Sequence, residues 1–277
     1  MATFKKMSPL ILLIMWILMS FSQASQSQNI TFLQNAYAHN DYWHKRPLFD
    51  ALDNGFTYME ADIYLRRGQL VVAHMLPLLK PSRTIDKLYL DPLSSFFEND
   101  TMGTAHPPIT LMIDIKSDPE KTYRSLAILL QKHKSLLSYY ENGTLYKRAV
   151  TIVITGNKPV RTIKSQYCRY VFIDEDLIQM AKETNPANLF PIASCRYNRI
   201  VSRNGEETIS KEEREHLCRY VQIAHQNGKK VRLWASPENA AIWKELLSCG
   251  VDLINTNKLV ELKTFLLNRY TDFAKTN

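Results

Sequence analysis

The feature that most constrains the fold of this chain is a regular alternation of short β-rich runs with amphipathic helical segments. Several runs are apolar on both faces, as residues 150–154 show, and this is typical of parallel strands that helices cover on either side. The pattern predicts eight strands, at residues 35–40, 56–65, 109–115, 149–155, 170–173, 190–194, 230–235 and 251–255.

Helix start and stop signals lie between these runs. Asp118 followed by Pro119 is typical of a helix N-terminus, and Ser210 with Glu213 forms a capping-box pattern. Gly228 stands where the helix that begins near Ser210 should end. The predicted helices are residues 47–54, 119–137, 211–227, 240–248 and 259–270.

Eight strands with intervening helices in 277 residues predict an α/β fold, a single-domain TIM (β/α)8 barrel. The alternative is an open doubly wound sheet, which usually has a glycine-rich phosphate loop after its first strand. No such loop follows residues 35–40, and the whole chain has only eight glycines, so a nucleotide-binding cradle is not expected.

The N-terminal residues have the composition of a targeting segment. Two lysines precede an apolar run at residues 9–21, and Ala24 ends a small-x-small pattern. The run is shorter than the roughly 20 residues of a membrane-spanning helix, so a retained anchor is the weaker alternative. We expect a signal peptide at residues 1–24, a barrel domain at 25–277, and a secreted or periplasmic protein. In a eukaryotic host, Asn29, Asn99 and Asn142 are candidate glycosylation acceptors.

The charge balance limits the class of partner. The formal net charge of +8 falls to +6 once Lys5 and Lys6 are removed with the signal peptide. A modest positive charge suits a phosphate-bearing substrate or contact with an anionic membrane surface, although a basic protein without an anionic partner fits equally well. No basic cluster is interleaved with aromatic residues, so no nucleic-acid partner is expected. We also expect the protein to be a monomer.

Four cysteines occupy the second half of the chain: Cys168, Cys195, Cys218 and Cys249. They lack the close paired spacing of a zinc site. Three pairings are open in an oxidising compartment. Cys218 with Cys249 is favoured, because these two lie on neighbouring predicted helices, and unpaired thiols are the alternative.

Polar side chains fall where the predicted strands end, which is where a barrel enzyme places its active site. Glu60 and Asp62 are two residues apart on one strand and therefore share a face, and Asp114 and Lys116 repeat this spacing. A turn at Arg67-Gly68 can return the chain over the same end. The candidate site residues are His39, Asn40, Glu60, Asp62, His74, Asp114, Lys116, Trp234 and Asn257.

Buried carboxylates that face one another are costly unless a cation neutralises them. The oxygen-only set Glu60, Asp62 and Asp114 favours one hard divalent ion, Mg²⁺ or Ca²⁺. Histidines titrate near neutral pH, so His39 and His74 suit the roles of general acid and base. The alternatives are ordinary ion pairs for the acids and a packing role for Trp234.

These residues resemble those of the PLC-like phosphodiesterase superfamily, which includes glycerophosphodiester phosphodiesterases and sphingomyelinase D enzymes. The resemblance spans most of the mature chain and is strongest at residues 37–74, with further matches at 111–116, 231–234 and 250–257. It implies a TIM barrel with one Mg²⁺ or Ca²⁺ ion. It also implies His39 and His74 as the acid/base pair, Glu60, Asp62 and Asp114 as metal ligands, Lys116 and Trp234 at the phosphate and pocket, and Asn257 as similar to an asparagine of the sphingomyelinase D branch.

The chain departs from this pattern at three motifs. Glycerophosphodiester phosphodiesterases typically have His-Arg-Gly where this chain has His39-Asn40-Asp41, so Asn40 replaces an arginine that contacts the phosphate. His74 is followed by Met75 rather than aspartate, and Asp114 resembles the sphingomyelinase D branch more than the glutamate of glycerophosphodiesterases. The pattern resembles a secreted branch that has a His-Asn-Asp motif at strand one.

The expected function is metal-dependent hydrolysis of a phosphodiester, either glycerophosphodiester or phospholipid-derived, directly or through a cyclic phosphate. One alternative is release of a lipid head group by phospholipase D-like chemistry, for which residues 75–79 would form an apolar rim; a covered loop is the plainer reading of that segment. An alternative of another class is a binder of phosphorylated ligands without catalysis.

Asp41, His44 and Arg46 are candidates for the edge of the site, and His106, His133, His216 and His225 are expected to be structural, in loops or on exposed helix faces.

Overall fold

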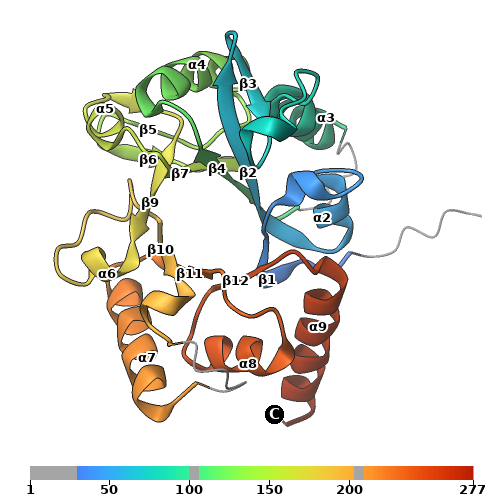
Figure 1. The fold of residues 1–277 in the computed structure, drawn as a ribbon, viewed down its shortest axis with the longest axis vertical. Helices are drawn as coiled ribbons and strands as arrows, with labels where there is room; N and C mark the ends of the chain where they lie inside the picture. Colours follow the sequence, from blue (N-terminus) through green and yellow to red (C-terminus); the bar gives the residue numbers. More distant parts are fainter. Residues whose placement is uncertain (1–29, 100–105, 203–208, 277) are drawn as a thin grey trace, which may run out of the picture. The chain divides into compact units, whose positions relative to one another are not determined.

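The computed structural model describes residues 30–99, 106–202 and 209–276. Eight parallel strands form a closed ring, because β1 pairs with both β12 and β2. The strands run around a ring in Figure 1 with the helices outside it. They are β1 (Leu33–Ala38), β2 (Phe56–Arg66), β4 (Ile109–Ile115), β7 (Val150–Gly156), β9 (Phe172–Asp176), β10 (Ile192–Arg196), β11 (Lys230–Trp234) and β12 (Leu253–Thr256). The predicted TIM barrel is confirmed, and no predicted strand is missing.

The five predicted helices are present in their predicted order, but the structure adds helices that were not predicted and ends one of the five earlier. They are α2 (Phe49–Asp53), α3 (Asp91–Glu98), α4 (Pro119–Lys132), α5 (Val160–Lys164), α6 (Leu177–Met180), α7 (Lys211–Gln226), α8 (Ala240–Ser248) and α9 (Leu259–Thr276). The sequence did not predict α3, the π-helical turn η3 (Asp86–Leu90) before it, or the short helices α5 and α6. The helix predicted at 119–137 ends at Lys132, because His133 leaves the helical conformation and its ring contacts Ser94 and Asp86.

Two hairpins add to the barrel. β3 (Gln69–Val72) pairs antiparallel with β2, and the turn between them has both Arg67 and Gly68 at positive φ. β5 (Tyr139–Glu141), β6 (Thr144–Tyr146) and β8 (Cys168–Arg169) form a separate three-stranded sheet. The first hairpin returns the chain toward the carboxyl ends of the barrel strands, as the Arg67-Gly68 turn predicted.

Strand register sets which side chains meet inside the barrel. Side chains alternate along a strand, so Glu60 and Asp62 point to the same side of β2. In the parallel pairing of β2 with β4, Glu60 lies opposite Met112 and Asp62 lies opposite Asp114. Two acids distant in sequence are therefore neighbours at the same end of the barrel.

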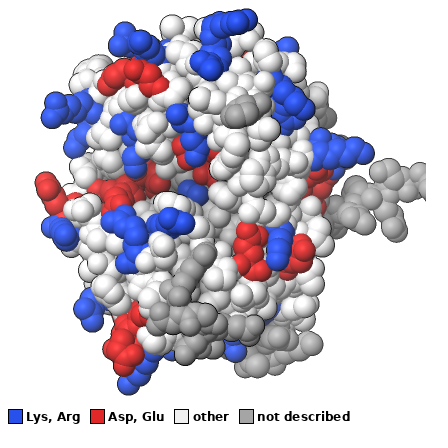
Figure 2. All heavy atoms as spheres, viewed as in Figure 1, with Lys and Arg blue, Asp and Glu red and all other residues white. Residues whose placement is uncertain are grey.

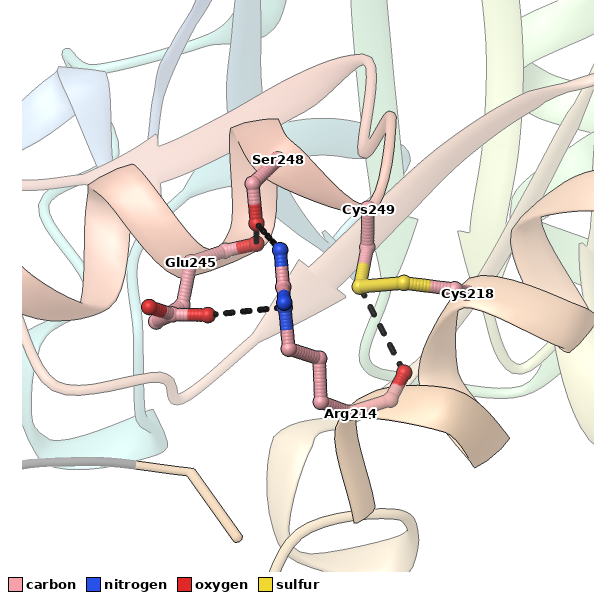
Figure 3. The surroundings of a disulfide bond; sticks show 5 residues. All are labelled: Arg214, Cys218, Glu245, Ser248 and Cys249. Carbon is pink, nitrogen blue, oxygen red and sulfur yellow. Dashed lines mark hydrogen bonds and ion pairs between the residues drawn. A yellow bond between two sulfur atoms is a disulfide. The ribbon is translucent and has the colours of Figure 1, made fainter. Parts of the chain in front are cut away.

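A disulfide joins Cys218 in α7 to Cys249 at the end of α8, which confirms the favoured pairing. Cys168 and Cys195 are free thiols. Figure 3 shows a second link beside the disulfide: Arg214 pairs with Glu245 at 3.1 Å and donates to the Ser248 hydroxyl at 3.0 Å. Covalent and polar contacts thus hold the same two helices together.

Replacing Cys218 and Cys249 together by serine should lower the free energy of unfolding by about 2–4 kcal/mol, because the unfolded chain gains the freedom of an open loop. The loop that the bridge closes spans 31 residues. Chemical unfolding of the two proteins under non-reducing conditions measures the difference. The matched control is Cys195→Ser, which removes a free thiol; an equal loss in both variants would contradict a specific role for the bridge.

The predicted signal peptide at residues 1–24 and the candidate glycosylation site Asn29 lie outside the described residues. Within the part of the chain that the structure describes, no helix has both the length and the apolar character needed to cross a bilayer.

Candidate active site

A cavity of about 470 Å³ opens at the carboxyl ends of the barrel strands. Figure 2 views the molecule from the same side as Figure 1, and acidic side chains lie directly beside basic ones over the ring of strands. The residues that line the cavity are His39, Asn40, Glu60, Asp62, His74, Asp114, Lys116, Thr155, Gly156, Lys158, Asp174, Glu175, Asp176, Ser194, Cys195, Arg196, Arg199, Arg232, Trp234 and Ala235.

The centre of this cavity is a group of three carboxylates. One oxygen from each of Glu60, Asp62 and Asp114 lies within 4.8 Å of the others. Burial, and then the charges of Glu60 and Asp114, raise the pKa of Asp62 to about 6. Burial also raises the pKa of Asp114. The fold therefore holds three acids close together in a place where their charges are unfavourable without a cation.

The three acids keep oxygen atoms available for such a cation. Arg232 donates to Glu60 Oε1 at 3.3 Å, and Lys116 donates to Asp114 Oδ2 at 2.6 Å. The other oxygens, Glu60 Oε2 and Asp114 Oδ1, are buried and accept no hydrogen bond. All donor contacts of Asp62 go to its Oδ2. Three carboxylates with ligand atoms within 4.8 Å of one another, two of them with a buried and unpartnered oxygen, fit a hard divalent ion.

Gly156 at the end of β7 makes room for the third acid. It has φ 68°, and a Cβ built on it would lie 1.9 Å from Asp114 Oδ1 and 2.8 Å from the carbonyl oxygen of Ile115. Nothing in the sequence indicated this role, because it depends on the pairing of β7 with β4, where Gly156 lies opposite Ile115. Only glycine leaves Asp114 in its observed position.

Gly156→Ala should displace the Asp114 carboxylate and weaken divalent-cation binding by about 10- to 100-fold, the usual cost of disturbing a group that orients a metal ligand. Calorimetric titration with Mg²⁺ or Ca²⁺ measures this. Gly68→Ala is the matched control, since Gly68 also has positive φ (78°) but a Cβ there would meet no atom within 4 Å. An equal loss of cation affinity in the two variants, relative to the wild-type protein, would show that backbone strain and not the contact with Asp114 causes the loss.

His39 follows β1, and a chain of hydrogen bonds fixes its ring. Asn257 Nδ2 donates to Glu238 Oε1 at 2.7 Å, so the amide oxygen of Asn257 faces His39 Nδ1 at 3.1 Å. Asn40 Nδ2 lies 3.1 Å from the same Nδ1, and the Asn257 oxygen accepts from Nδ1 when that nitrogen carries the hydrogen. Nε2 then points to the carboxylate group, 3.4 Å from Glu60 Oε2. Burial lowers the pKa of His39, with Glu60 opposing the shift, so the neutral ring is favoured.

His74 reaches the same cavity from the end of the β2–β3 hairpin. Its Nδ1 lies 3.1 Å from Asp62 Oδ2, and its ring packs edge-on against Trp43 with centroids 5.3 Å apart. The Tyr42 hydroxyl lies 2.8 Å from Asp62 Oδ2 and 2.8 Å from Asn40 Oδ1, so it links the two histidine-bearing segments. The contact with Asp62 holds the Nδ1 side of the His74 ring, and the residue lines the cavity.

The structure brings together most of the residues that the sequence predicted for the site. Asn40, Lys116 and Trp234 line the cavity with the two histidines and the three acids. Asn257 does not line it but contacts His39. The predicted set therefore occupies one end of the barrel.

Of the three candidates for the edge of the site, none lines the cavity, and two have structural contacts elsewhere. Asp41 is buried and accepts from the Leu48 backbone and from the Tyr89 hydroxyl. Arg46 pairs with acids of α2. His44 is not among the residues that line the cavity. His133, expected in a loop or on an exposed face, is buried, although its role is structural as predicted.

Several residues of the site were not predicted from the sequence. Arg232 is buried below Glu60 and lies 4.2 Å from the Tyr37 ring centroid. Its two-residue spacing from Trp234 on one strand was the available signal, since both share a face. Nothing in the sequence indicated Glu238, which contacts Asn257, or Tyr42, which contacts Asp62. The missed basic residues that line the cavity are Lys158, Arg196, Arg199 and Arg232.

Comparisons with known proteins agree with this architecture. Altered inheritance of mitochondria protein 6 from Eremothecium gossypii is 28% identical over 280 residues, which covers 87% of this chain and 72% of that protein. The homolog of that protein in Arthroderma benhamiae is 26% identical over 261 residues, which covers 83% of this chain and 82% of the length of the homolog.

Two solved structures share the fold. A glycerophosphodiester phosphodiesterase from Parabacteroides distasonis matches with a TM-score of 0.51 and 14% identity, over 87% of this chain and 97% of its own. A calcium-dependent phosphoinositol-specific phospholipase C from a Pseudomonas species matches with a TM-score of 0.54 and 12% identity, over 81% of this chain and 89% of its own. The family model for the AIM6-like phosphodiesterase domain matches residues 25–174, more than half of the chain. This protein therefore belongs to the family that carries the AIM6-like phosphodiesterase domain.

Proposed function

We propose that this protein is a metal-dependent phosphodiesterase that hydrolyses a glycerophosphodiester or a phospholipid-derived phosphodiester. The observation that carries the proposal is the meeting of three carboxylates within 4.8 Å of one another, two of them with an unpartnered oxygen, beside two histidines whose Nδ1 atoms contact Asn257 Oδ1 and Asp62 Oδ2. A binder needs the cation but not two oriented proton carriers. Catalysis therefore explains the arrangement better than ligand binding without turnover.

Glu60, Asp62 and Asp114 would hold one Mg²⁺ or Ca²⁺ ion. A divalent ion there supplies positive charge to a phosphate oxygen and so stabilises charge that develops in the transition state. The protein adds charge of its own, because Lys116 lies at the carboxylate group and Arg196 lines the same cavity. Burial disfavours the charge of Lys116, but Asp114 and Asp62 outweigh it and raise the pKa of this amine.

The two histidines divide the proton transfers between them. His39 Nε2 takes the proton from the attacking hydroxyl, which belongs either to water or to a neighbouring group of the substrate that closes a cyclic phosphate. His74 Nε2 gives a proton to the leaving oxygen. The contacts to Asn257 and Asp62 fix both rings, so neither needs to reorient during the reaction. Asn40, at the position of an arginine in glycerophosphodiester phosphodiesterases, donates hydrogen bonds without charge, so part of the phosphate binding falls to Lys158, Arg196 and Arg199.

A panel of glycerophosphodiesters, lysolipids and sphingomyelin, assayed with and without EDTA and followed by phosphorus NMR, tests the proposal. Cation-dependent appearance of a phosphomonoester or a cyclic phosphate supports it, and the product identifies the bond that breaks. Release of the head-group alcohol from sphingomyelin or a lysolipid would favour the phospholipase D-like alternative. Tight cation-dependent binding without any product would instead support a non-catalytic binder.

An exposed apolar rim beside the cavity favours a lipid substrate as the second candidate. Trp43, which packs on His74, is 57% exposed, and Met75, Leu76 and Leu78 are about half exposed. The sequence offered residues 75–79 as a rim only as the alternative to a covered loop, and these three side chains are exposed rather than covered by the described part of the chain. Apolar side chains left exposed at the mouth of a site are typical of proteins that meet a membrane surface. Export after cleavage near Ala24 would place this rim at an extracellular or periplasmic surface.

Leu78→Asp should weaken binding to phosphatidylserine-containing vesicles by at least about tenfold, because a buried leucine contributes about 1.5–3 kcal/mol. Vesicle sedimentation at fixed salt measures the partition. Ile128→Asp is the matched control, since Ile128 is 71% exposed on α4 and is remote in sequence from the rim. Vesicle binding that survives Leu78→Asp would exclude the rim as the contact surface, while leaving the phosphodiesterase proposal intact.

A further inference from the structure

A second cavity, of about 520 Å³, lies at the opposite end of the barrel, and we call it the basal cavity. Its walls come from the first residues of the strands: Tyr58 near the start of β2, Thr110 in β4, Thr151 in β7 and Lys230 in β11. The candidate metal ligands lie farther along these strands. Because parallel strands begin at one end of a barrel and finish at the other, the two cavities are on opposite faces.

The basal cavity exists because short side chains occupy the first inward positions. Thr110 lies opposite both Tyr58 and Thr151 in the register, and the next inward residues along β4 and β7 are Met112 and Val153. Met112 and Val153 belong to a buried apolar cluster that also contains Tyr37, Phe172, Ile192 and Leu253. This layer closes the barrel between the two cavities. Threonines are too small to fill the space below it.

The lining of the basal cavity combines an apolar floor with a positive rim. Val153, Phe172 and Ile192 form the floor, and Leu145 from β6 covers one side. Lys147, Arg148 and Lys230 are its charged residues, and among the described residues that line it none is Asp or Glu. The candidate active site differs in this respect, because acids and bases alternate there.

The positive groups of the rim are not neutralised by acids. No ion pair within 4.0 Å involves Lys147 or Lys230 in the described residues, and Lys230 Nζ lies 5.1 Å from the Tyr58 ring centroid. Arg148 donates to the carbonyl oxygens of Lys134 and Ser135 at 2.9 and 2.8 Å, which holds its guanidinium in place. The rim therefore has one fixed positive charge and two lysines that an incoming anion can engage.

We propose that the basal cavity binds a single-chain anionic amphiphile, with its alkyl chain against Val153, Phe172 and Ile192 and its head group at Lys147 and Lys230. The volume lies within the range of about 300–1,000 Å³ that small-molecule sites have, and an apolar lining with a few placed polar groups is their usual composition. The apolar floor excludes a free inorganic anion as the preferred ligand. The absence of acids on the described lining excludes a cationic amphiphile.

Calorimetric titration of the full chain with hexanoate, octanoate and decanoate, in EDTA, tests this site without reference to catalysis. The dissociation constant should fall about fourfold for each added methylene, since a buried CH₂ contributes about 0.8 kcal/mol. Decyl phosphate in place of decanoate distinguishes a phosphate from a carboxylate head group, and binding of either supports the proposal. Decyltrimethylammonium that binds as tightly as decanoate, or inorganic phosphate that binds better than both anionic amphiphiles, would overturn it.

Two variants tie the binding to the basal cavity. The double variant Lys147→Gln/Lys230→Gln should raise the dissociation constant for decanoate about 5- to 10-fold, as expected for two solvent-exposed charge contacts. Lys182→Gln/Lys244→Gln, which changes two exposed lysines that do not line the cavity, should leave it unchanged. Equal effects of the two double variants would refute the site. Thr151→Phe, which fills the space, should abolish binding; if circular dichroism shows that it does not fold, the lysine variants decide the question.

Discussion

Asp114→Asn is expected to remove cation-dependent activity and, independently, to remove the stabilisation that a divalent cation gives the folded protein. Asparagine keeps the size of the side chain but loses the charge of one of the three converging carboxylates. Losing a cation that supplies several kcal/mol of charge stabilisation corresponds to a fall in kcat of about 10² to 10⁴. Phosphodiester cleavage with and without EDTA measures the first effect.

The second effect needs no substrate and therefore separates a lost cation site from a lost reaction. A ligand present at 100 times its dissociation constant stabilises the native state by about 2.7 kcal/mol. Wild-type protein should therefore unfold at a higher temperature with Mg²⁺ or Ca²⁺ than with EDTA, and Asp114→Asn should unfold at the same temperature in both. Asp118→Asn is the matched control, because Asp118 caps α4 outside the cavity and asparagine is an equally good cap. A cation-induced shift that persists in Asp114→Asn would exclude Asp114 as a ligand.

The elements that the sequence predicted best are those whose pattern is local. β4 was predicted at its observed bounds, Ile109–Ile115, because a β-rich run lies between a Pro-Pro pair and the N-cap of a helix. The two-residue spacing of Glu60 and Asp62 was enough to place both on one face. The turn at Arg67-Gly68 was enough to return His74 to the same end of the barrel.

The elements that the sequence did not predict depend on neighbours in space. Gly156 gives no sign in the sequence that it lies against Asp114, because this contact depends on the register of β7 with β4. Glu238 fixes the orientation of Asn257 from a different loop, 19 residues away. His133 ends α4 early because its ring finds partners in a segment about 40 residues before it. Periodicity within one segment carries no information on such contacts.

The same distinction applies to three candidate residues that lie shortly after His39 in the sequence. Asp41, His44 and Arg46 are close to His39 in sequence, and proximity along the chain suggested that they line the site. The turn η1 (Asp41–Trp43) instead directs Asp41 into the core, where it accepts hydrogen bonds from Leu48 and Tyr89. Tyr42, between them, faces Asp62. Whether a residue belongs to the site therefore depends on the direction of its side chain, and in this turn neighbouring residues point in different directions.

His39→Ala should lower kcat about 10²- to 10⁴-fold, the usual contribution of a positioned general base, while cation affinity changes little. The ring contributes a proton acceptor at Nε2, and the contact between Asn257 and Nδ1 serves only to hold that ring. Added imidazole should restore part of the activity, because the space left by the side chain opens into the cavity. His216→Ala is the control, since His216 lies on α7 and packs on Tyr220. If cleavage in the presence of Mg²⁺ continues at the wild-type rate in His39→Ala, while calorimetry shows the cation still bound, the proton transfer assigned to His39 belongs to another group.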